Sequence, residues 1–284
     1  MQPVTRLLLA SVSLGAVAVV SPAGAQRRGD DYYTAPRNAT VNAAGARLIR
    51  IRARAGELKV TGVDNLAEAR VKGEARASEK EDLEDIKLRA ERHGDVVEIE
   101  VDIPEHRGMQ WGNDYRGLDL EIQVPRSAAL DVEDSSGDAE FRHVGALDLN
   151  DSSGEIIIRD AAGAVRVEDS SGGIEIETVR GDVNVRDSSG DIEVRDVTGR
   201  VTVDDDSSGS IYASRVSGTV HVRDDSSGDI QVSDVGGDFV VDHDSSGDIS
   251  HRGVKGQVRV PETRAQRRER RARERERDRG GDWQ

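Results

Sequence analysis

The sequence predicts an all-β protein whose main part is a right-handed parallel β-helix, or β-solenoid, of about seven coils. Three observations predict this fold. The tetrapeptide Asp-Ser-Ser-Gly recurs seven times at steps of 17 to 19 residues, a second glycine follows each copy, and apolar residues alternate between them. One such unit cannot bury its own apolar side chains, so the units are expected to stack around a continuous core.

Residues 1–25 have the pattern of a secretory signal peptide. Arg6 supplies a positive charge, an uncharged apolar run extends from Leu7 to Val20, and small residues precede a cut before Gln26. The run is shorter than the roughly 20 residues that a membrane-spanning helix needs, which disfavours the alternative of an uncleaved anchor. We therefore expect an exported protein, periplasmic or extracellular, with no transmembrane segment after cleavage.

Two segments lie between the leader and the repeats. Residues 26–40 are polar and lack periodicity, so they are predicted to be a linker. Residues 41–125 contain short alternating runs such as Leu48–Ile51 and Val96–Val101, which predict half-buried strands within the solenoid domain or capping it. Ser78 and Glu81 have the spacing of a capping box at the start of one or two helical turns.

The repeats between residues 126 and 260 predict the core in detail. Aligned, they give five apolar columns, which begin at Ala139, Phe141, Val144, Leu147 and Leu149. Small β-branched residues dominate these columns and suit a narrow, flat core. The glycines are expected to allow sharp turns, with positive φ where the turn requires it.

Runs such as 187–194 and 197–203 are similar to a bacterial family of exported β-strand-repeat proteins. That family is known as "putative adhesins", domains of unknown function with a β-helix like the head of an autotransporter adhesin. The resemblance covers roughly Val41 to Val260. It implies a right-handed β-helix in the cell envelope or outside the cell, and it brings no catalytic residues.

The repeated aspartate is the sharpest candidate site. Carboxylates stacked at about 4.8 Å repel one another, so something must offset their charge. An Asx-type turn would do so through the N–H groups of the following serine and glycine, helped by flanking arginines such as Arg186 and Arg223. Calcium is the alternative, because it prefers oxygen ligands and further acids crowd these corners. The candidate calcium ladder consists of Asp134, Asp151, Asp169, Asp187, Asp206, Asp225 and Asp244.

Three other features have weaker functional interpretations. The serine ladders could present a regular hydroxyl face to a glycan or to ordered water. His221 and His243 could help to hold a metal, although their different offsets from the corners favour solvated surface histidines, and His251 stands at a core position of the last coil. In the segment 261–284, the residues from Arg264 to Gln284 include nine arginines and five acids, which predicts a disordered or marginally helical tail, or an arm for anionic polymers.

Composition narrows the function. The chain has no cysteine, which excludes disulfides, thiolate metal sites and cysteine nucleophiles, and its formal charge of −15 disfavours nucleic acid as a partner. We expect a non-enzymatic envelope protein with an adhesin-like interaction surface, no cofactor other than calcium, and envelope glycans or proteins as partners. A polysaccharide-acting β-helix enzyme and a purely structural spacer are the alternatives. Oligomeric state does not follow from the sequence.

Overall fold

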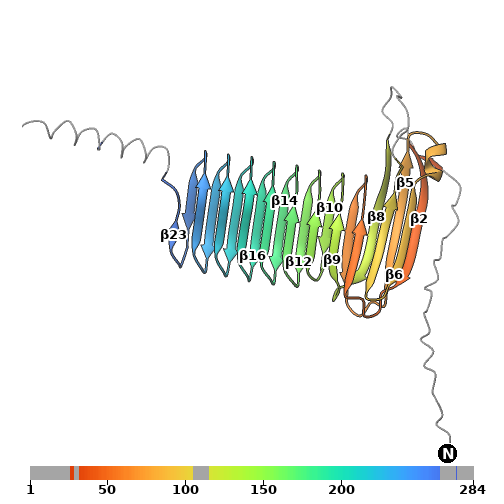
Figure 1. The fold of residues 1–284 in the computed structure, drawn as a ribbon, viewed down its shortest axis with the longest axis horizontal. Coiled ribbons are helices and arrows are strands. Elements are labelled where there is room, and N and C mark those ends of the chain that lie inside the picture. The colour runs from red at the N-terminus through yellow and green to blue at the C-terminus, as the bar shows by residue number, and fades with distance from the viewer. Residues whose placement is uncertain (1–25, 29–31, 105–114, 263–272, 274–284) are drawn as a thin grey trace, which may run out of the picture.

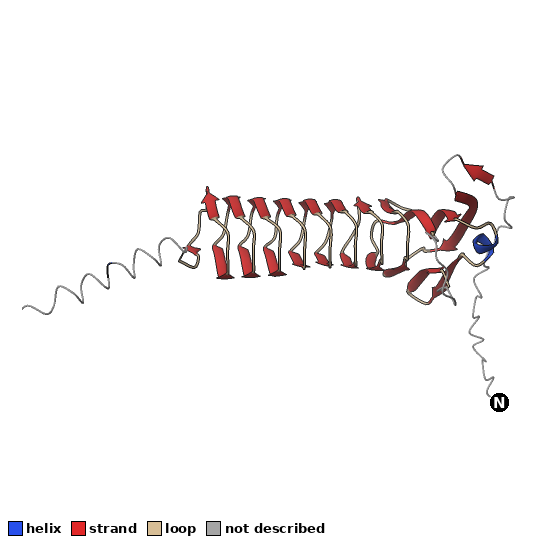
Figure 2. Cartoon of the chain, turned by 90° about the horizontal axis from the view of Figure 1, so that it is seen from above, coloured by secondary structure: helices blue, strands red, loops and turns tan. Residues whose placement is uncertain are grey.

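The computed structural model describes residues 26–28, 32–104, 115–262 and 273 (Figure 1). The predicted signal peptide and almost all of the predicted tail lie outside these residues. Two long sheets face each other along the whole molecule, and short turns join them at both edges (Figure 2). We refer to them as sheet A, with 12 strands, and sheet B, with 11 strands.

Each repeat is one coil that contributes one strand to each sheet. Equivalent residues pair in parallel register, so that Ile192 lies between Ile174 and Ile211. This arrangement confirms the predicted parallel solenoid, while its right-handed sense stays a prediction. The repeat strands of sheet A are β10 (Ala139–Arg142), β12 (Ile156–Ala161), β14 (Ile174–Val179), β16 (Ile192–Val197), β18 (Ile211–Val216), β20 (Ile230–Val235) and β22 (Ile249–Arg252). Those of sheet B are β11 (Leu147–Asn150), β13 (Val165–Glu168), β15 (Val183–Asp187), β17 (Val201–Asp206), β19 (Val220–Asp225), β21 (Phe239–Asp244) and β23 (Val258–Arg259).

The five predicted apolar columns form the core between the sheets. Their members are buried from Ala139 to Val241, because alternate residues of each strand point inward. Burial is lost in the last coil, where His251 is exposed and Val258 is 37% exposed. The columns are therefore confirmed, and the final coil is packed more loosely than the others.

The N-terminal strands extend the same two sheets and share one core with the repeats. Beyond β10, sheet A continues through β4 (Leu58–Val63), β8 (Arg116–Pro125), β5 (Glu68–Ala77), β2 (Tyr32–Asn42) and β1 (Gln26–Arg28). Beyond β11, sheet B continues through β9 (Ala129–Glu133), β3 (Leu48–Arg52), β7 (Val96–Asp102) and β6 (Lys87–His93). The outermost of these strands pair antiparallel, unlike the repeats.

The predicted linker at residues 26–40 instead contains β1 and most of β2. Strand β2 pairs with β5 from Tyr33 to Asn42, and this pairing buries Ala35 and Val41. The segment is polar in composition because its other side chains lie outside the core at the end of sheet A. Pairing with a distant strand, which local composition does not encode, decides its structure.

A short helix closes the N-terminal end of the core. It is the 3-10 helix η1 (Glu81–Glu84), and it places Leu83 and Ile86 in the core with at most 3% exposure. Arg37 of β2 holds it, because its guanidinium donates to the carbonyls of Leu83 and Ile86. The predicted capping box is wrong: Lys80 is the N-cap, and the Ser78 hydroxyl accepts the Tyr115 N–H instead.

The two corners of each coil bend in different ways. At the first corner the Asp-Ser-Ser-Gly glycine has positive φ, as at Gly190 with φ 137°, which confirms the prediction there. At the second corner the left-handed residue is not the glycine but an earlier residue such as Thr178 or Asp196, with φ 60° and 58°. The second glycine is needed for close approach, since a Cβ at Gly181 would lie 2.7 Å from the Ala164 nitrogen.

A β-bulge explains the change from 18-residue to 19-residue steps. The register between β15 and β17 shifts after Val185, and Arg186 pairs with Asp205 rather than with Asp204. The extra residue is absorbed at this point, because Asp187 and Asp206 still pair with each other. The repeated aspartate therefore keeps its inward direction in coils of different length.

Candidate functional site

The repeated aspartates lie inside the solenoid. The six buried members, which we call the aspartate ladder, are at most 5% exposed: Asp134, Asp151, Asp169, Asp187, Asp206 and Asp225. Asp244, in the last coil, is half-buried. Sequence reasoning placed this column at the corner without recognising that it faces inward. A signal was present, because Asp187 follows the core residue Val185 by two positions and so points to the same side of the strand.

One oxygen of most ladder carboxylates caps the following turn. In the second repeat, Oδ1 of Asp151 accepts the N–H of Ser152 at 2.7 Å and that of Ser153 at 3.4 Å. Asp169 does the same with the next two serines. The predicted Asx-type turn is thus confirmed for the serine N–H groups. The glycine N–H bonds elsewhere, as when Gly154 donates to the Ser171 carbonyl of the next coil.

The second oxygen of these carboxylates has no hydrogen-bond partner in the described structure. This holds for Oδ2 of the ladder members from Asp134 to Asp206, and for both oxygens of Asp225. Burial, together with the charges of Asp225 and Asp187, raises the pKa of Asp206 to about 7. Burial likewise raises the pKa of Asp134 to about 7, and that of Asp151 and Asp187 to about 6, against the serine N–H bonds that lower it. Burial and the charge of Asp244 raise the pKa of Asp225 to about 6.

The charged residues around the corners do not neutralise the ladder. Arg186 and Arg223 point outward, and Arg223 pairs with Asp204 at 2.7 Å. The additional acids also have structural partners, since Oδ1 of Asp191 accepts the Ser210 N–H of the next coil at 2.8 Å. The expectation that flanking arginines pair with the ladder is therefore wrong, because alternation along the strand places them on its opposite face.

Calcium binding at the ladder stays a prediction. Across residues 32–104 and 115–262, no group of three or more histidine, aspartate or glutamate side chains is arranged to hold a metal ion. The two surface histidines stay apart from the ladder: His221 Nε2 lies 2.8 Å from Asp242 Oδ2, and His243 is exposed.

The two serines of each corner have different roles. The second serine donates its hydroxyl to a carbonyl of the preceding coil, as Ser227 does to Ser207 at 3.2 Å and Ser246 to Ser226 at 3.1 Å. The first serine is exposed in each coil. Among the described residues, the row of first serines is therefore the more exposed of the two, at the edge of the solenoid.

The outer face of sheet A changes its chemistry along the solenoid. From β10 to β16 its outward side chains form ion pairs across coils. Glu175 is the centre of this lattice, 3.3 Å from Arg159 and 2.8 Å from Arg195, and Arg195 also lies 2.6 Å from Glu193. The charged groups here are engaged with one another, so this stretch offers few free donors or acceptors.

From β18 onward the same face is mostly polar and uncharged, up to Arg252 of β22, which lies beside Ser233. Its outward residues form two rows that continue the register of the ion pairs, and we call them the polar patch: Tyr212, Gln231 and Ser250 in one row, with Ser214 and Ser233 in the other. They line a shallow hollow of about 450 Å³ that Glu193 and Arg252 border. None of the five side chains has a hydrogen-bond partner within the described coils. Their hydroxyl and amide groups are available to a ligand.

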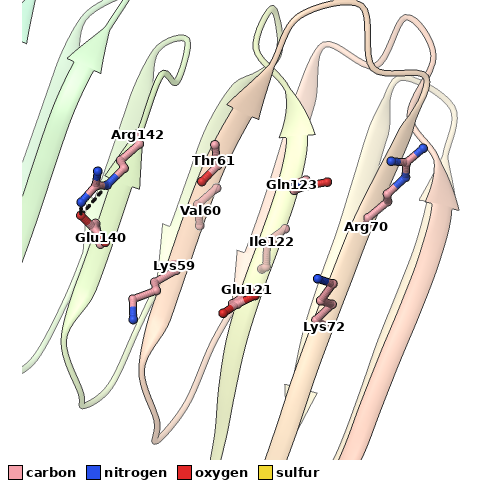
Figure 3. Close-up of a pocket in the computed structure, with 10 residues that line it drawn as sticks. All are labelled: Lys59, Val60, Thr61, Arg70, Lys72, Glu121, Ile122, Gln123, Glu140 and Arg142. Carbon is pink, nitrogen blue, oxygen red and sulfur yellow. Dashed lines mark hydrogen bonds and ion pairs between the residues drawn. The ribbon is translucent and has the colours of Figure 1, made fainter.

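A second hollow of about 410 Å³ lies on sheet A near the N-terminal end (Figure 3). Its floor lies over the buried residues Val60 and Ile122, and basic residues surround it. Lys59 pairs with Glu57 at 2.7 Å and Arg142 with Glu140, while Lys72 has no ion-pair partner among the residues described here. In this row lysines and glutamates alternate across the strands, since Glu121 lies between Lys59 and Lys72.

A comparison with protein-family models shows which family the chain belongs to. The family model Toastrack DUF4097 matches residues 49–272. The chain belongs to this family. The match begins in β3 and covers the following N-terminal strands and every coil, in agreement with their common core, while β1 and β2 precede it. It also confirms the resemblance to a bacterial repeat family of unknown function, while the Toastrack assignment itself names no ligand.

Solved structures with some similarity have low sequence identity to this Toastrack chain. A "putative adhesin" from Bacteroides fragilis is 12% identical with a TM-score of 0.46, covering 79% of this chain and 96% of its own. A "putative lipid binding protein" from Parabacteroides distasonis is 15% identical with a TM-score of 0.46, covering 79% and 93%. A "putative cell adhesion protein" from Clostridium sporogenes is 13% identical with a TM-score of 0.31, covering 79% and 98%. The solenoid fold of this chain follows from its own strand pairing.

A search of curated proteins found no match to this chain. Within the described residues, no helix is long and apolar enough to cross a membrane.

Proposed function

We propose that this Toastrack protein is a non-catalytic, exported binding protein of the cell envelope, whose polar patch holds a neutral glycan chain. The observation that supports this proposal is the contrast within one face of sheet A. The charged side chains from β10 to β16 are occupied by one another, whereas the hydroxyl and amide groups of Tyr212, Gln231 and Ser233 have no partner in the described structure.

The chemistry of the polar patch favours a neutral glycan over a charged ligand. Hydroxyl and amide groups both donate and accept hydrogen bonds, which matches the hydroxyls of a sugar. The ring of Tyr212 adds a flat apolar surface beside them, at low entropic cost because its side chain has few rotatable bonds. The parallel rows place equivalent groups about 4.8 Å apart, so the patch suits an extended chain that lies across several coils.

The test is binding of neutral oligosaccharides of about four to six hexoses to the purified protein, on an array and then by calorimetry. The double variant Tyr212→Ala/Gln231→Ala should lose binding by at least tenfold. Its matched control is Ser207→Ala/Ser226→Ala, which removes exposed hydroxyls of the corner row and should bind as the unaltered protein does. Raising the salt concentration should leave the affinity unchanged, because no ion pair is involved.

Two results would reject the polar patch as the site. The first is equal loss of binding in the corner-serine control, which would assign the ligand to the serine row. The second is binding restricted to acidic glycans, abolished by salt and insensitive to Tyr212→Ala, which would assign it to the basic hollow around Lys72. If the protein binds no glycan on the array or by calorimetry, it is better explained as a structural spacer. If it cleaves the oligosaccharides, it is an enzyme.

A further inference from the structure

The aspartate ladder carries six carboxyl groups inside a protein without a compensating cation in the described structure. Each of the six is at most 5% exposed, and each has at least one oxygen without a hydrogen-bond partner. Adjacent members stack directly, since Asp187 pairs in register with Asp206, and Asp206 with Asp225. Buried carboxylates that repel one another in this way are costly in the ionised form.

The groups facing the ladder do not supply positive charge. Along the column, each aspartate faces only the aspartates of neighbouring coils. From the adjoining strand ends, Asp205 acts on Asp206 and Asp224 acts on Asp225, which adds negative charge. From the turn, only serine N–H groups reach the carboxylates. From the core, the neighbours are apolar columns such as those of Val203 and Ile211.

We propose that the aspartate ladder is an internal proton-binding site, in which protons occupy enough of the six carboxyl groups that adjacent coils do not both carry a charge. A proton taken up from solvent joins one carboxylate and makes it a neutral carboxylic acid. Its O–H can donate to an unpaired oxygen of the ladder, while the ionised neighbours keep their bonds to the serine N–H groups. The ligand is the proton, and the binding groups are this column alone.

The direction of the pH dependence follows from burial. Because the pKa values of these carboxyls lie above the ordinary aspartate value of 3.8 in the folded protein, the folded state binds more protons than the unfolded state between about pH 4 and pH 7. The free energy of unfolding should therefore fall as pH rises through this window. Proton binding makes the exported solenoid more stable in mildly acidic surroundings than in alkaline ones.

The experiment measures unfolding by urea at about pH 5 and pH 8. In the unaltered protein the unfolding equilibrium constant should be smaller at pH 5, by about tenfold for each titrating ladder aspartate. The triple variant Asp187→Asn/Asp206→Asn/Asp225→Asn keeps the side-chain shape and an acceptor for the serines but cannot titrate. Between pH 5 and pH 8 its unfolding equilibrium constant should therefore rise about a thousandfold less than that of the unaltered protein. At pH 8 the variant should be at least as stable as the unaltered protein.

A matched control changes exposed aspartates beside the same corners. In Asp191→Asn/Asp229→Asn/Asp248→Asn the amide oxygens can still accept the backbone N–H bonds seen at Asp191 and Asp229. This control should keep the full pH dependence. Carbon-13 NMR of the aspartate carboxyls in the unaltered protein gives a reading that does not depend on any variant folding, and it should show several midpoints above pH 5.5.

Three outcomes would overturn the proposal. One is a set of carboxyl signals that all titrate below about pH 4.5. Another is the same pH dependence in the ladder variant and in the exposed control. The third is an increase in stability at pH 7.5 when millimolar calcium replaces chelator, lost in the ladder variant, which would show that a metal cation rather than the proton compensates the ladder.

Discussion

Asp206 lies directly against Asp187 in the neighbouring coil of sheet B, and neither side chain is more than 1% exposed. This pair shows that the most regular polar residue of the sequence belongs to the core rather than to the surface. The same stacking that makes the apolar columns favourable makes this column unfavourable when it is ionised. The stability of the solenoid should therefore depend on pH through the six buried members of this column.

The pH profile of stability should have a maximum at about pH 4. The ladder accounts for the decrease above this pH. Below it, hydrogen bonding by His143 and the nearby Arg126 hold the pKa of Asp160 below its usual value of 3.8, and Arg215 does the same for Asp196. The stability that these two carboxylates contribute is lost as pH falls through their lowered pKa values.

Urea unfolding between about pH 3 and pH 8 checks this profile. Asp160→Asn should reduce the decrease on the acid side and leave the slope from pH 5 to pH 8 unchanged. A stability that rises steadily from pH 5 to pH 8 would contradict the assignment of the alkaline side to the ladder.

Ile192→Asp should destabilise or unfold the protein. Ile192 is fully buried between Ile174 and Ile211, and a carboxylate there would have neither solvent nor a partner. We expect a loss of more than about 4 kcal/mol in the free energy of unfolding. The control Gln231→Asp introduces the same side chain on the outer face of the same sheet and should change stability by less than about 0.5 kcal/mol. Similar losses in both would mean that Ile192 does not face the core.

Gly190→Ala should be far more harmful than Gly45→Ala. Both glycines have positive φ, at 137° and 68°. A Cβ on Gly190 would lie 1.7 Å from the Gly172 carbonyl oxygen, whereas a Cβ on Gly45 meets nothing within 4 Å. We expect a cost of about 1 kcal/mol at Gly45, from backbone conformation alone, and at least about 3 kcal/mol at Gly190. Equal costs in calorimetric unfolding would argue against the close contact of successive corners.

Thr178→Asn should stabilise the protein. Thr178 is β-branched and has φ 60°, a conformation that asparagine adopts with less strain. We expect a gain of about 0.5 to 1 kcal/mol in the free energy of unfolding. Asp234→Asn is the control, because Asp234 has φ 55° at the equivalent corner and already belongs to a tolerant residue type. A decrease in stability for Thr178→Asn alone would show that the threonine side chain has a favourable role of its own.

The repeats make the solenoid and its core predictable because each position occurs seven times. A column such as that of Ile192 and Ile211 is visible in the amino-acid sequence alone. A strand pairing outside the repeats, such as that of β2 with β5, occurs only once and leaves no repeated pattern in the sequence. For this reason the sequence predicts a linker where the structure has β2. The Ser78 spacing matches a capping box, yet Tyr115, far along the chain, determines what its hydroxyl contacts.

The aspartate column shows why the sequence alone does not predict the geometry of the candidate site. The sequence shows the period of Asp187 and Asp206 but not the bulge that keeps both inward in coils of different length. The polar patch is likewise invisible in the sequence. Tyr212, Gln231 and Ser250 differ in type, and only the register of three coils brings them into one row.

The two ends of the solenoid differ in packing: the N-terminal end is closed, and the last coil is loosely packed. Leu83 and Ile86 seal the first end, whereas Val258 and Val260 remain more than a third exposed at the other among the described residues. A chain synthesised from its N-terminus would complete the sealed end first and then wind each new coil onto a finished template. Unwinding would begin at the opposite end, so amide hydrogens near β22 should exchange with solvent long before those near β10.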